Sequence, residues 1–246
     1  MDIEQVVYTV VREYKPPKKE NLIEFRTPGS KILIAQTALK SYHRFFFTKK
    51  INLLYRDLLE QTDIDQINMV HATTLFTDGA IAFKLYKAYG KQYVVTVRNT
   101  DVNYFLNLRP DLYFLAKAIL LGAEHITFLS PGLKEKFLSH WFISRFRREI
   151  DKKIKIVYNG IEDSWIKNVR LKDKSEIEKP CKLLFVGRIS KEKNLERLIT
   201  AISELSGTIT GLSISLVGPW GNDKESVSAL MKKYPSLLHY HGEINN

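Results

Sequence analysis

The chain has 246 residues, 44% of them apolar, which is enough for one large domain or for two domains with cores of their own. It carries 38 Lys and Arg against 27 Asp and Glu, and a formal charge of +11 favours anionic partners such as phosphates, acidic lipid headgroups or nucleic acid. The single cysteine, Cys181, excludes an intramolecular disulfide and a cysteine-rich zinc site. No apolar run approaches the roughly 18 residues that cross a bilayer, and the amino terminus has no signal pattern. We therefore expect a cytoplasmic protein, soluble or peripheral at the inner face of the membrane.

The amino-terminal part has an irregular pattern. Residues 3–14 and 31–37 are typical of strands, and residues 42–61 are typical of a long amphipathic helix. Nothing before Gly29 reads as a glycine-rich loop.

From Ile67 onward, short apolar runs alternate with helical patterns. The pattern predicts strands over residues 67–72, 92–97, 125–130 and 153–160, and helices over 77–90, 111–122 and 131–142. Thr77 or Asp78 is expected to cap the first of these helices, and Ser130 followed by Pro131 is expected to begin the third. This alternation predicts an α/β fold, a parallel sheet with helices on both faces.

A polar, highly charged stretch that ends in Pro180 interrupts the alternation, and we interpret residues 169–180 as a linker between domains. After it come a strand near residue 184 and a helix whose apolar stripe runs from Leu195 to Leu205. A strand (212–218), a helix (222–234) and a strand (237–244) follow. The predicted domains are 1–168 and 181–246, and we expect the second to be incomplete because it stops after three strands.

The loop between that strand and helix concentrates cations. Gly187 ends the apolar run, and Arg188 and Lys193 stand just before the helix, where positive charge is mildly unfavourable. An anion bound between Arg188 and Lys193 would make their positive charge favourable at this position. Gly187 would let the backbone approach the anion, and Asn194 would cap the helix. A solvated loop with its lysines in water is the alternative that the loop alone leaves open.

The stretch "FVGRISKEKNLERLITAI" resembles the opening strand, loop and helix of the carboxyl-terminal domain in family-4 glycosyltransferases (glycosyl transferases group 1). These enzymes have the GT-B architecture of two facing Rossmann-like domains. The segments "HATTLFTDGAIAFKLYKAYGKQYVVTVRNTD", "ITFLSPGLKEKF", "IVYNGIEDSWI" and "LSISLVGPWG" are similar to further parts of the family in the same order, so the resemblance covers residues 67–246.

The resemblance implies a retaining, hexosyltransferase-type enzyme that moves a sugar from a UDP- or GDP-sugar to a glycan or lipid-linked acceptor, in envelope polysaccharide or glycolipid synthesis. It implies a metal-independent reaction with no cofactor, because positive side chains hold the diphosphate as its charge grows. It also assigns residues to roles. The donor diphosphate would be bound by Gly187, Arg188 and Lys193, and the acceptor side of the cleft would be lined by Thr77, Asp78, Gly79, Asn99 and Thr100.

The chain departs from the family pattern in two places that matter for chemistry. Arg98 stands where many members have a histidine, and it cannot act as a base because its pKa stays above about 12. Asp101 is the nearest other catalytic candidate, although a loop-capping role is the alternative. The family's pair of glutamates for the donor sugar would lie beyond Asn246, so the resemblance implies a truncated enzyme.

Three further features have a structural and a functional interpretation. Asp63 and Asp65 match a metal-binding Asp-x-Asp, but a polar turn is the preferred interpretation. His71 is expected to be a structural histidine, with a substrate contact as the alternative. Residues 43–50 and 141–155 combine aromatic and basic side chains, which suit docking on an anionic membrane or, equally, core aromatics beside a solvated basic face.

Two rival functions remain at this point. The chain could be a basic nucleic-acid-binding α/β protein, although it lacks a recognisable nucleic-acid-binding motif, so no nucleic acid is expected. It could also be a non-catalytic fragment that binds a partner glycosyltransferase subunit.

Overall fold

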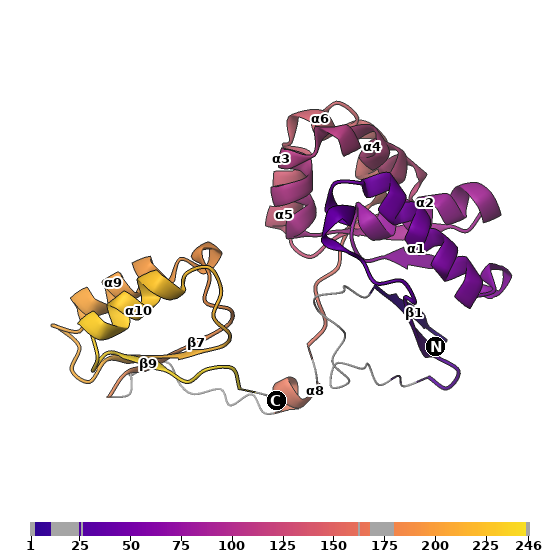
Figure 1. The fold of residues 1–246 in the computed structure, drawn as a ribbon. Coiled ribbons are helices and arrows are strands. Elements are labelled where there is room, and N and C mark those ends of the chain that lie inside the picture. The colour runs from indigo at the N-terminus through magenta and orange to yellow at the C-terminus, as the bar shows by residue number, and fades with distance from the viewer. Residues whose placement is uncertain (1–2, 11–24, 26, 162, 168–179, 245–246) are drawn as a thin grey trace. The chain divides into compact units, whose positions relative to one another are not determined.

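The computed structural model describes residues 3–10, 25, 27–161, 163–167 and 180–244, shown in Figure 1. The chain divides into two compact units, unit 1 (Met1–Glu162) and unit 2 (Asp163–Asn246). Both are α/β units with parallel sheets. The expected linker lies outside the described residues except for Pro180.

Unit 1 begins with a small two-stranded sheet and a long helix. Strands β1 (Val6–Thr9) and β2 (Lys31–Ile34) pair in parallel, followed by the 3-10 helix η2 (Ser41–Arg44) and helix α1 (Phe47–Gln61). The helix expected from residue 42 therefore begins at Phe47. The preceding turn is separate because the Nδ1 atom of His43 accepts the backbone N–H of Lys40 at 2.9 Å.

The buried carboxylate of Asp57 on α1 connects this helix to both strands. It accepts the Tyr8 hydroxyl at 2.6 Å, the backbone N–H of Gln36 at 2.9 Å and the side-chain amide of Gln61 at 2.7 Å. Burial and this hydrogen bond raise the pKa of Tyr8 well above its usual value. The contacts fix β1 and the end of β2 against α1.

The main sheet of unit 1 has four parallel strands in the order of the chain: β3 (Val70–Ala72), β4 (Tyr93–Val97), β5 (His125–Phe128) and β6 (Ile154–Ile156). The connections contain α2 (Thr77–Tyr89), α4 (Tyr113–Gly122) and α5 (Pro131–Leu138). Shorter elements complete the unit: η3 (Ile64–Gln66), η4 (Asp101–Phe105), α3 (Leu106–Leu108), η5 (Pro110–Leu112), α6 (Trp141–Ser144), α7 (Arg147–Ile150) and η6 (Asp151–Lys153). The predicted alternation of strands and helices is confirmed.

The ends of two predicted helices are confirmed in detail. Gly90 ends α2 in the left-handed conformation at φ 67°, and the hydroxyl of Ser130 accepts the backbone N–H of Leu133 at the start of α5. The helix expected over residues 131–142 is instead two helices, because His140 adopts an extended conformation and its ring caps α6.

The two faces of the main sheet differ in chemistry. One face is fully buried in the core and carries Ala72, Tyr93, Val95, Val97, Ile126 and Phe128. The other carries a polar row in which the Nε2 atom of His71 lies 2.8 Å from the Thr96 hydroxyl, which lies 2.7 Å from the hydroxyl of Thr127. His71 is exposed and hydrogen-bonded.

Unit 2 contains a short helix α8 (Asp163–Lys167) and a three-stranded parallel sheet in chain order, β7 (Lys182–Val186), β8 (Ser213–Val217) and β9 (Leu238–Tyr240). Between the strands lie η7 (Lys191–Lys193), α9 (Leu195–Leu205) and α10 (Lys224–Lys233). Figure 1 shows α9 and α10 on the same side of this sheet.

In the described part of unit 2, the helices between the strands lie on one face of the sheet (Figure 1). Crossover connections between parallel strands are right-handed, and here each new strand is added on the same side of the previous one. Successive helices therefore lie on the same face of the sheet. The opposite face of β7 is open, with Leu184 and Val186 exposed at 67% and 69%. The core lies under α9 and α10, with Ile199, Ile202, Ile214 and Leu216 buried.

Candidate functional site

The loop after β7 in unit 2 is held by the loop after β8. The backbone N–H of Gly187 donates to Val217 at 2.9 Å, and that of Ile189 donates to Pro219 at 3.0 Å. The N–H of Gly221 donates back to Ile189 at 2.9 Å. The two loops therefore run together as one backbone layer at the carboxyl ends of β7 and β8, in front of α9.

Three glycines allow these loops to approach. Gly187 has a φ of 153°, and Gly218 has a φ of 134°, both in the region that favours glycine. A Cβ atom on Gly218 would overlap the carbonyl oxygen of Gly187 and lie 2.7 Å from its carbonyl carbon. A Cβ atom on Gly221 would lie 2.7 Å from the carbonyl oxygen of Ile189. Sequence reasoning singled out Gly187 and missed Gly218 and Gly221, although the G-x-x-G spacing directly after β8 was a usable signal.

The cations of this loop are exposed. Arg188 and Lys193 both present their side chains to solvent, together with Lys191. Lys191 is fixed through its backbone N–H, which donates to the Oδ1 atom of Asn222 at 3.0 Å. Hydrogen bonds from its own backbone, from Ser190 and from Asn222, together with the charge of Arg188, hold the pKa of Glu192 below its usual range.

The expected capping role of Asn194 is wrong. Asn194 adopts the left-handed conformation at φ 53° and its side chain makes no capping hydrogen bond to α9. Asparagine is one of the few residues that tolerate this conformation, and here it turns the chain from η7 into α9. The first N–H groups of α9 therefore receive no cap from this side chain.

In unit 1 the candidate residues lie at the carboxyl ends of β3 and β4. Arg98 is half-buried, and its Nε atom donates to the carbonyl oxygen of Thr73 at 2.8 Å. Asn99 and Thr100 are exposed in the following turn. The turn leads into η4, a π-helical segment, a geometry that is rare and occurs frequently at functional sites.

Asp101 joins the β4 loop to the start of α2. Its carboxylate accepts the backbone N–H of Arg98 at 2.9 Å and that of Leu75 at 3.1 Å, and the side chain is 1% exposed. Burial raises its pKa to about 6, although these hydrogen bonds and one from Phe76 act in the opposite direction. Buried in this way, Asp101 can position the loop that carries Arg98.

Asp101 also explains why the cap predicted for α2 is wrong. Thr77 and Asp78 lie inside the helix, because the N–H groups before it are already satisfied by the carboxylate from the neighbouring loop. The Thr77 hydroxyl accepts Lys50 Nζ at 2.8 Å, and the Asp78 carboxylate accepts the Thr73 hydroxyl at 2.7 Å. Gly79 is buried and lets α2 approach its neighbours, since a Cβ atom there would lie 3.0 Å from Ile119.

The remaining candidates from the sequence have structural roles. Asp63 Oδ1 accepts the backbone N–H of Asp65 at 3.0 Å and caps η3, which confirms the polar turn. Within the described ranges, no group of three His, Cys, Asp or Glu side chains could hold a metal ion. No described helix is long and apolar enough to span a membrane.

No protein-family model matches the chain. A curated protein of Methanocaldococcus jannaschii, named an uncharacterized glycosyltransferase, is 30% identical over 122 residues, which are 49% of this chain and 29% of that protein.

Several solved structures have a similar fold. Sucrose-phosphate synthase from Thermosynechococcus elongatus matches 98% of this chain and 60% of its own, with 16% identity and a TM-score of 0.65. Trehalose-6-phosphate synthase from E. coli, solved with UDP-2-fluoro glucose, matches 85% of this chain and 55% of its own, with 14% identity and a TM-score of 0.59. HepE from Anabaena, solved with UDP, matches 87% of this chain and 56% of its own, with 13% identity and a TM-score of 0.56.

These likenesses define the class of fold. The chain has the α/β fold of the GT-B glycosyltransferases, with two parallel-sheet units. It spans between about half and two thirds of the length of these solved chains and under a third of the curated relative.

Proposed function

We propose that the chain is part of a family-4 glycosyltransferase that uses a nucleotide-sugar donor. One observation carries the proposal: an exposed pair of cations, Arg188 and Lys193, on a loop whose glycines bring two backbones together in front of a helix amino terminus. The names of the relatives support it, since one is a glycosyltransferase and two of the solved structures hold UDP or a UDP-sugar.

The chemistry of transfer suits this loop. When the bond between the sugar and the diphosphate breaks, negative charge grows on the departing oxygen, and positive groups held near it stabilise the transition state. Arg188 and Lys193 would bind the diphosphate from two sides, and the first N–H groups of α9, which the Asn194 side chain does not cap, would add donors. The backbones of Gly187 and Gly218 are in close contact, with no side chain between them, and this contact keeps the loop after β7 against the loop after β8.

Unit 1 would supply the acceptor side. Thr77, Asp78, Asn99 and Thr100 surround the carboxyl ends of β3 and β4, with Gly79 packed behind them. Arg98 would contact an anionic group of donor or acceptor, and Asp101 would hold the Arg98 loop. We propose a retaining, hexosyl-type transfer to a glycan or lipid-linked acceptor in the cytoplasm, within envelope polysaccharide or glycolipid synthesis.

Calorimetric titration of UDP and GDP tests the donor site. Replacing Arg188 with alanine should weaken binding of the preferred nucleotide roughly 10- to 100-fold, since hydrogen bonds to charged groups contribute about 1.5–3 kcal/mol each. Lys232→Ala is the matched control, because Lys232 is an exposed cation in the last turn of α10 and should bind as the wild type does. Failure of both nucleotides to bind the wild-type chain would refute the proposal.

The same titrations separate the rival functions. A basic nucleic-acid-binding protein would bind DNA or RNA with steep salt dependence and would respond similarly to loss of Arg188 or Lys232. A partner-binding fragment would bind neither nucleotide. Selective loss with Arg188→Ala is expected only for a built phosphate site.

A further inference from the structure

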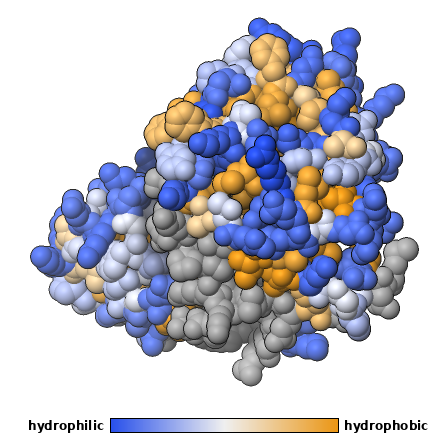
Figure 2. Space-filling view, turned by 45° about the vertical axis from the view of Figure 1, so that its right-hand side comes forward, coloured by the Kyte–Doolittle hydropathy of each residue, from blue (hydrophilic) through white to orange (hydrophobic). Residues whose placement is uncertain are grey.

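Among the large apolar side chains that unit 1 exposes are four aromatic ones at the amino-terminal ends of α1, α4 and α6. Phe45 and Phe46 precede α1 and are 81% and 61% exposed, Phe114 on α4 is 81% exposed, and Trp141 on α6 is 56% exposed. Other aromatic residues of the same stretches, Phe47 and Phe146, are buried in the core, so a packing role accounts for only part of the set. Figure 2 shows apolar side chains reaching the surface between hydrophilic ones.

Contacts through residues 109–114 connect the three stretches. Phe45 and Phe46 line an open pocket of about 430 Å³ together with Arg109 and Leu112. Leu112 is followed directly by Tyr113 and Phe114, whose rings meet α6: Tyr113 lies 5.5 Å from Trp141 and Phe114 lies 6.4 Å from Phe142, between ring centroids. We call the exposed residues Phe45, Phe46, Phe114 and Trp141 the aromatic surface.

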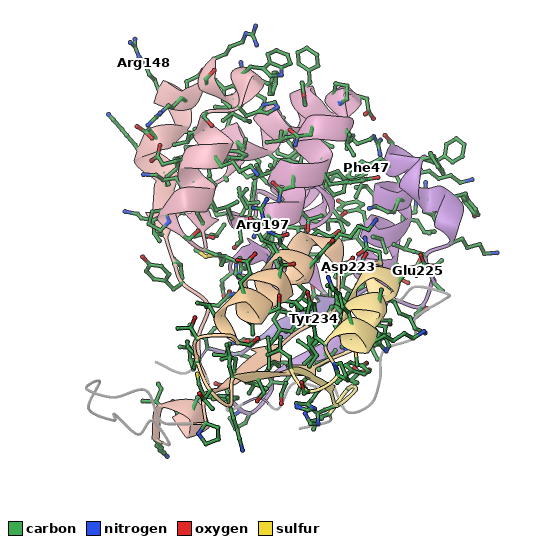
Figure 3. The ribbon with its side chains drawn as sticks, turned by 90° about the vertical axis from the view of Figure 1, so that its left-hand side faces the viewer. Phe47, Arg148, Arg197, Asp223, Glu225 and Tyr234 are labelled. Atoms are coloured by element: carbon green, nitrogen blue, oxygen red, sulfur yellow. The ribbon has the colours of Figure 1, made fainter. Side chains whose placement is uncertain are left out.

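Basic side chains stand beside two of these stretches, and another lies on the following helix. Lys49 lines the pocket, and the guanidinium of Arg145 lies 4.5 Å from the centre of the Trp141 ring. Arg148 on α7 extends outward from the unit, as Figure 3 shows. The nearby acids are partly neutralised, since Asp111 makes two short hydrogen bonds with Arg109, at 2.8 and 2.6 Å, and Asp151 lies 4.0 Å from Arg147.

We propose that the aromatic surface docks unit 1 on an anionic lipid bilayer. Aromatic rings settle at the boundary of headgroups and acyl chains, and Lys and Arg beside them gain from the negative potential of acidic lipids. The arrangement offers both, because Lys49 lines the pocket with Phe45 and Phe46, and Arg145 lies over the Trp141 ring. A protein partner would have to bring matching acidic groups, whereas an acidic bilayer presents them everywhere. The inference does not depend on the diphosphate loop of unit 2.

Vesicle flotation of the full chain tests the proposal. Vesicles of phosphatidylcholine alone are compared with vesicles that also contain phosphatidylglycerol, at about 0.1 M salt. The wild type should float with the anionic vesicles and bind the neutral ones far more weakly. Failure to bind the anionic vesicles would overturn the proposal and leave a protein partner for this surface, and equal binding to both kinds would overturn the requirement for anionic lipid.

Substitutions separate aromatic insertion from simple charge attraction. Phe114→Ser and Phe46→Ser should each weaken binding roughly tenfold, since each removes one ring from the interface. Arg145→Gln with Arg148→Gln should weaken it roughly 25-fold, from about fivefold for each charge. Wild-type affinity in the two serine variants would overturn the aromatic role and leave only attraction of charge.

Matched controls come from unit 2. Trp165→Ser removes an aromatic side chain that is 68% exposed on α8, and Lys232→Gln removes an exposed cation on α10. Both should bind vesicles as the wild type does. In a chain with Trp165 and Trp220 replaced by phenylalanine, the emission of Trp141 should shift to shorter wavelength with anionic vesicles and be quenched by brominated lipid. An unchanged spectrum in the presence of bound vesicles would overturn insertion of this residue.

Discussion

Replacing Gly218 with alanine should both destabilise unit 2 and weaken nucleotide binding. The added Cβ atom would overlap the carbonyl oxygen of Gly187 and lie 2.7 Å from its carbonyl carbon, and the φ of 134° is unfavourable for any residue with a Cβ atom. Backbone strain of this kind costs about 1–3 kcal/mol, and forcing two packed segments apart adds about 1–3 kcal/mol. We therefore expect a loss of about 2–6 kcal/mol in the free energy of unfolding.

The assay follows urea unfolding through the fluorescence of Trp220, which lies in the loop after β8 with its ring 4.3 Å from that of Tyr240. Trp141 and Trp165 are replaced by phenylalanine so that the signal reports unit 2 alone. Gly207→Ala is the matched control, because its Cβ atom would meet only the Glu204 carbonyl oxygen at an ordinary 3.7 Å. It should change stability by less than about 1 kcal/mol.

Two results would show that this reasoning is mistaken. One is an unfolding midpoint of Gly218→Ala equal to that of the wild type. The other is a large loss of stability with unchanged affinity for UDP or GDP, which would separate the close contact of Gly187 and Gly218 from the binding loop.

Three further predictions concern the rest of the chain. Asp57→Ala should destabilise unit 1 by about 3 kcal/mol in urea unfolding, since it leaves the partners in Tyr8, Gln36 and Gln61 unpaired, whereas Tyr8→Phe should cost about 1 kcal/mol. The pKa of Asp101 is about 6 in the folded protein and 3.8 in the unfolded chain, so the folded state binds the proton more tightly. The protonated side chain therefore contributes its full stability below pH 3.8, and this contribution is lost as the pH rises through 6. Asp101→Asn should remove that slope from the pH dependence of the unfolding midpoint. Sugar transfer should continue undiminished in a chelator.

Each of these has a clear contrary outcome. Equal stability of Asp57→Ala and Tyr8→Phe would show that the buried carboxylate makes no net contribution beyond one hydrogen bond. An identical pH slope in Asp101→Asn would mean that another group titrates there. Activity lost in a chelator and restored by manganese would contradict a metal-independent reaction.

The order of helices and strands followed from the sequence because it depends on local chemistry. Apolar residues at a spacing of two or of three to four mark each element, and Gly90 and Ser130 are residue types favoured at the ends of helices. The loop with Arg188 and Lys193 was found in the same way, since its residues are consecutive.

The missed features depend on contacts between residues far apart in the sequence. No local pattern reveals that Asp101 satisfies the backbone of Leu75 at the start of α2, so Thr77 and Asp78 were expected to cap. The approach of Gly218 to Gly187 is likewise a property of two loops. Asn194 was misjudged because asparagine suits both a helix cap and a left-handed turn.

The strand order has a consequence for how the chain is made. In both main sheets each strand pairs with the one that precedes it in the chain, β3 to β6 in unit 1 and β7 to β9 in unit 2. Every new strand thus meets its partner as soon as the helix between them has been synthesised, and the loops to be closed are short. Each sheet can therefore grow on the ribosome by one strand and one helix at a time, without waiting for any later segment.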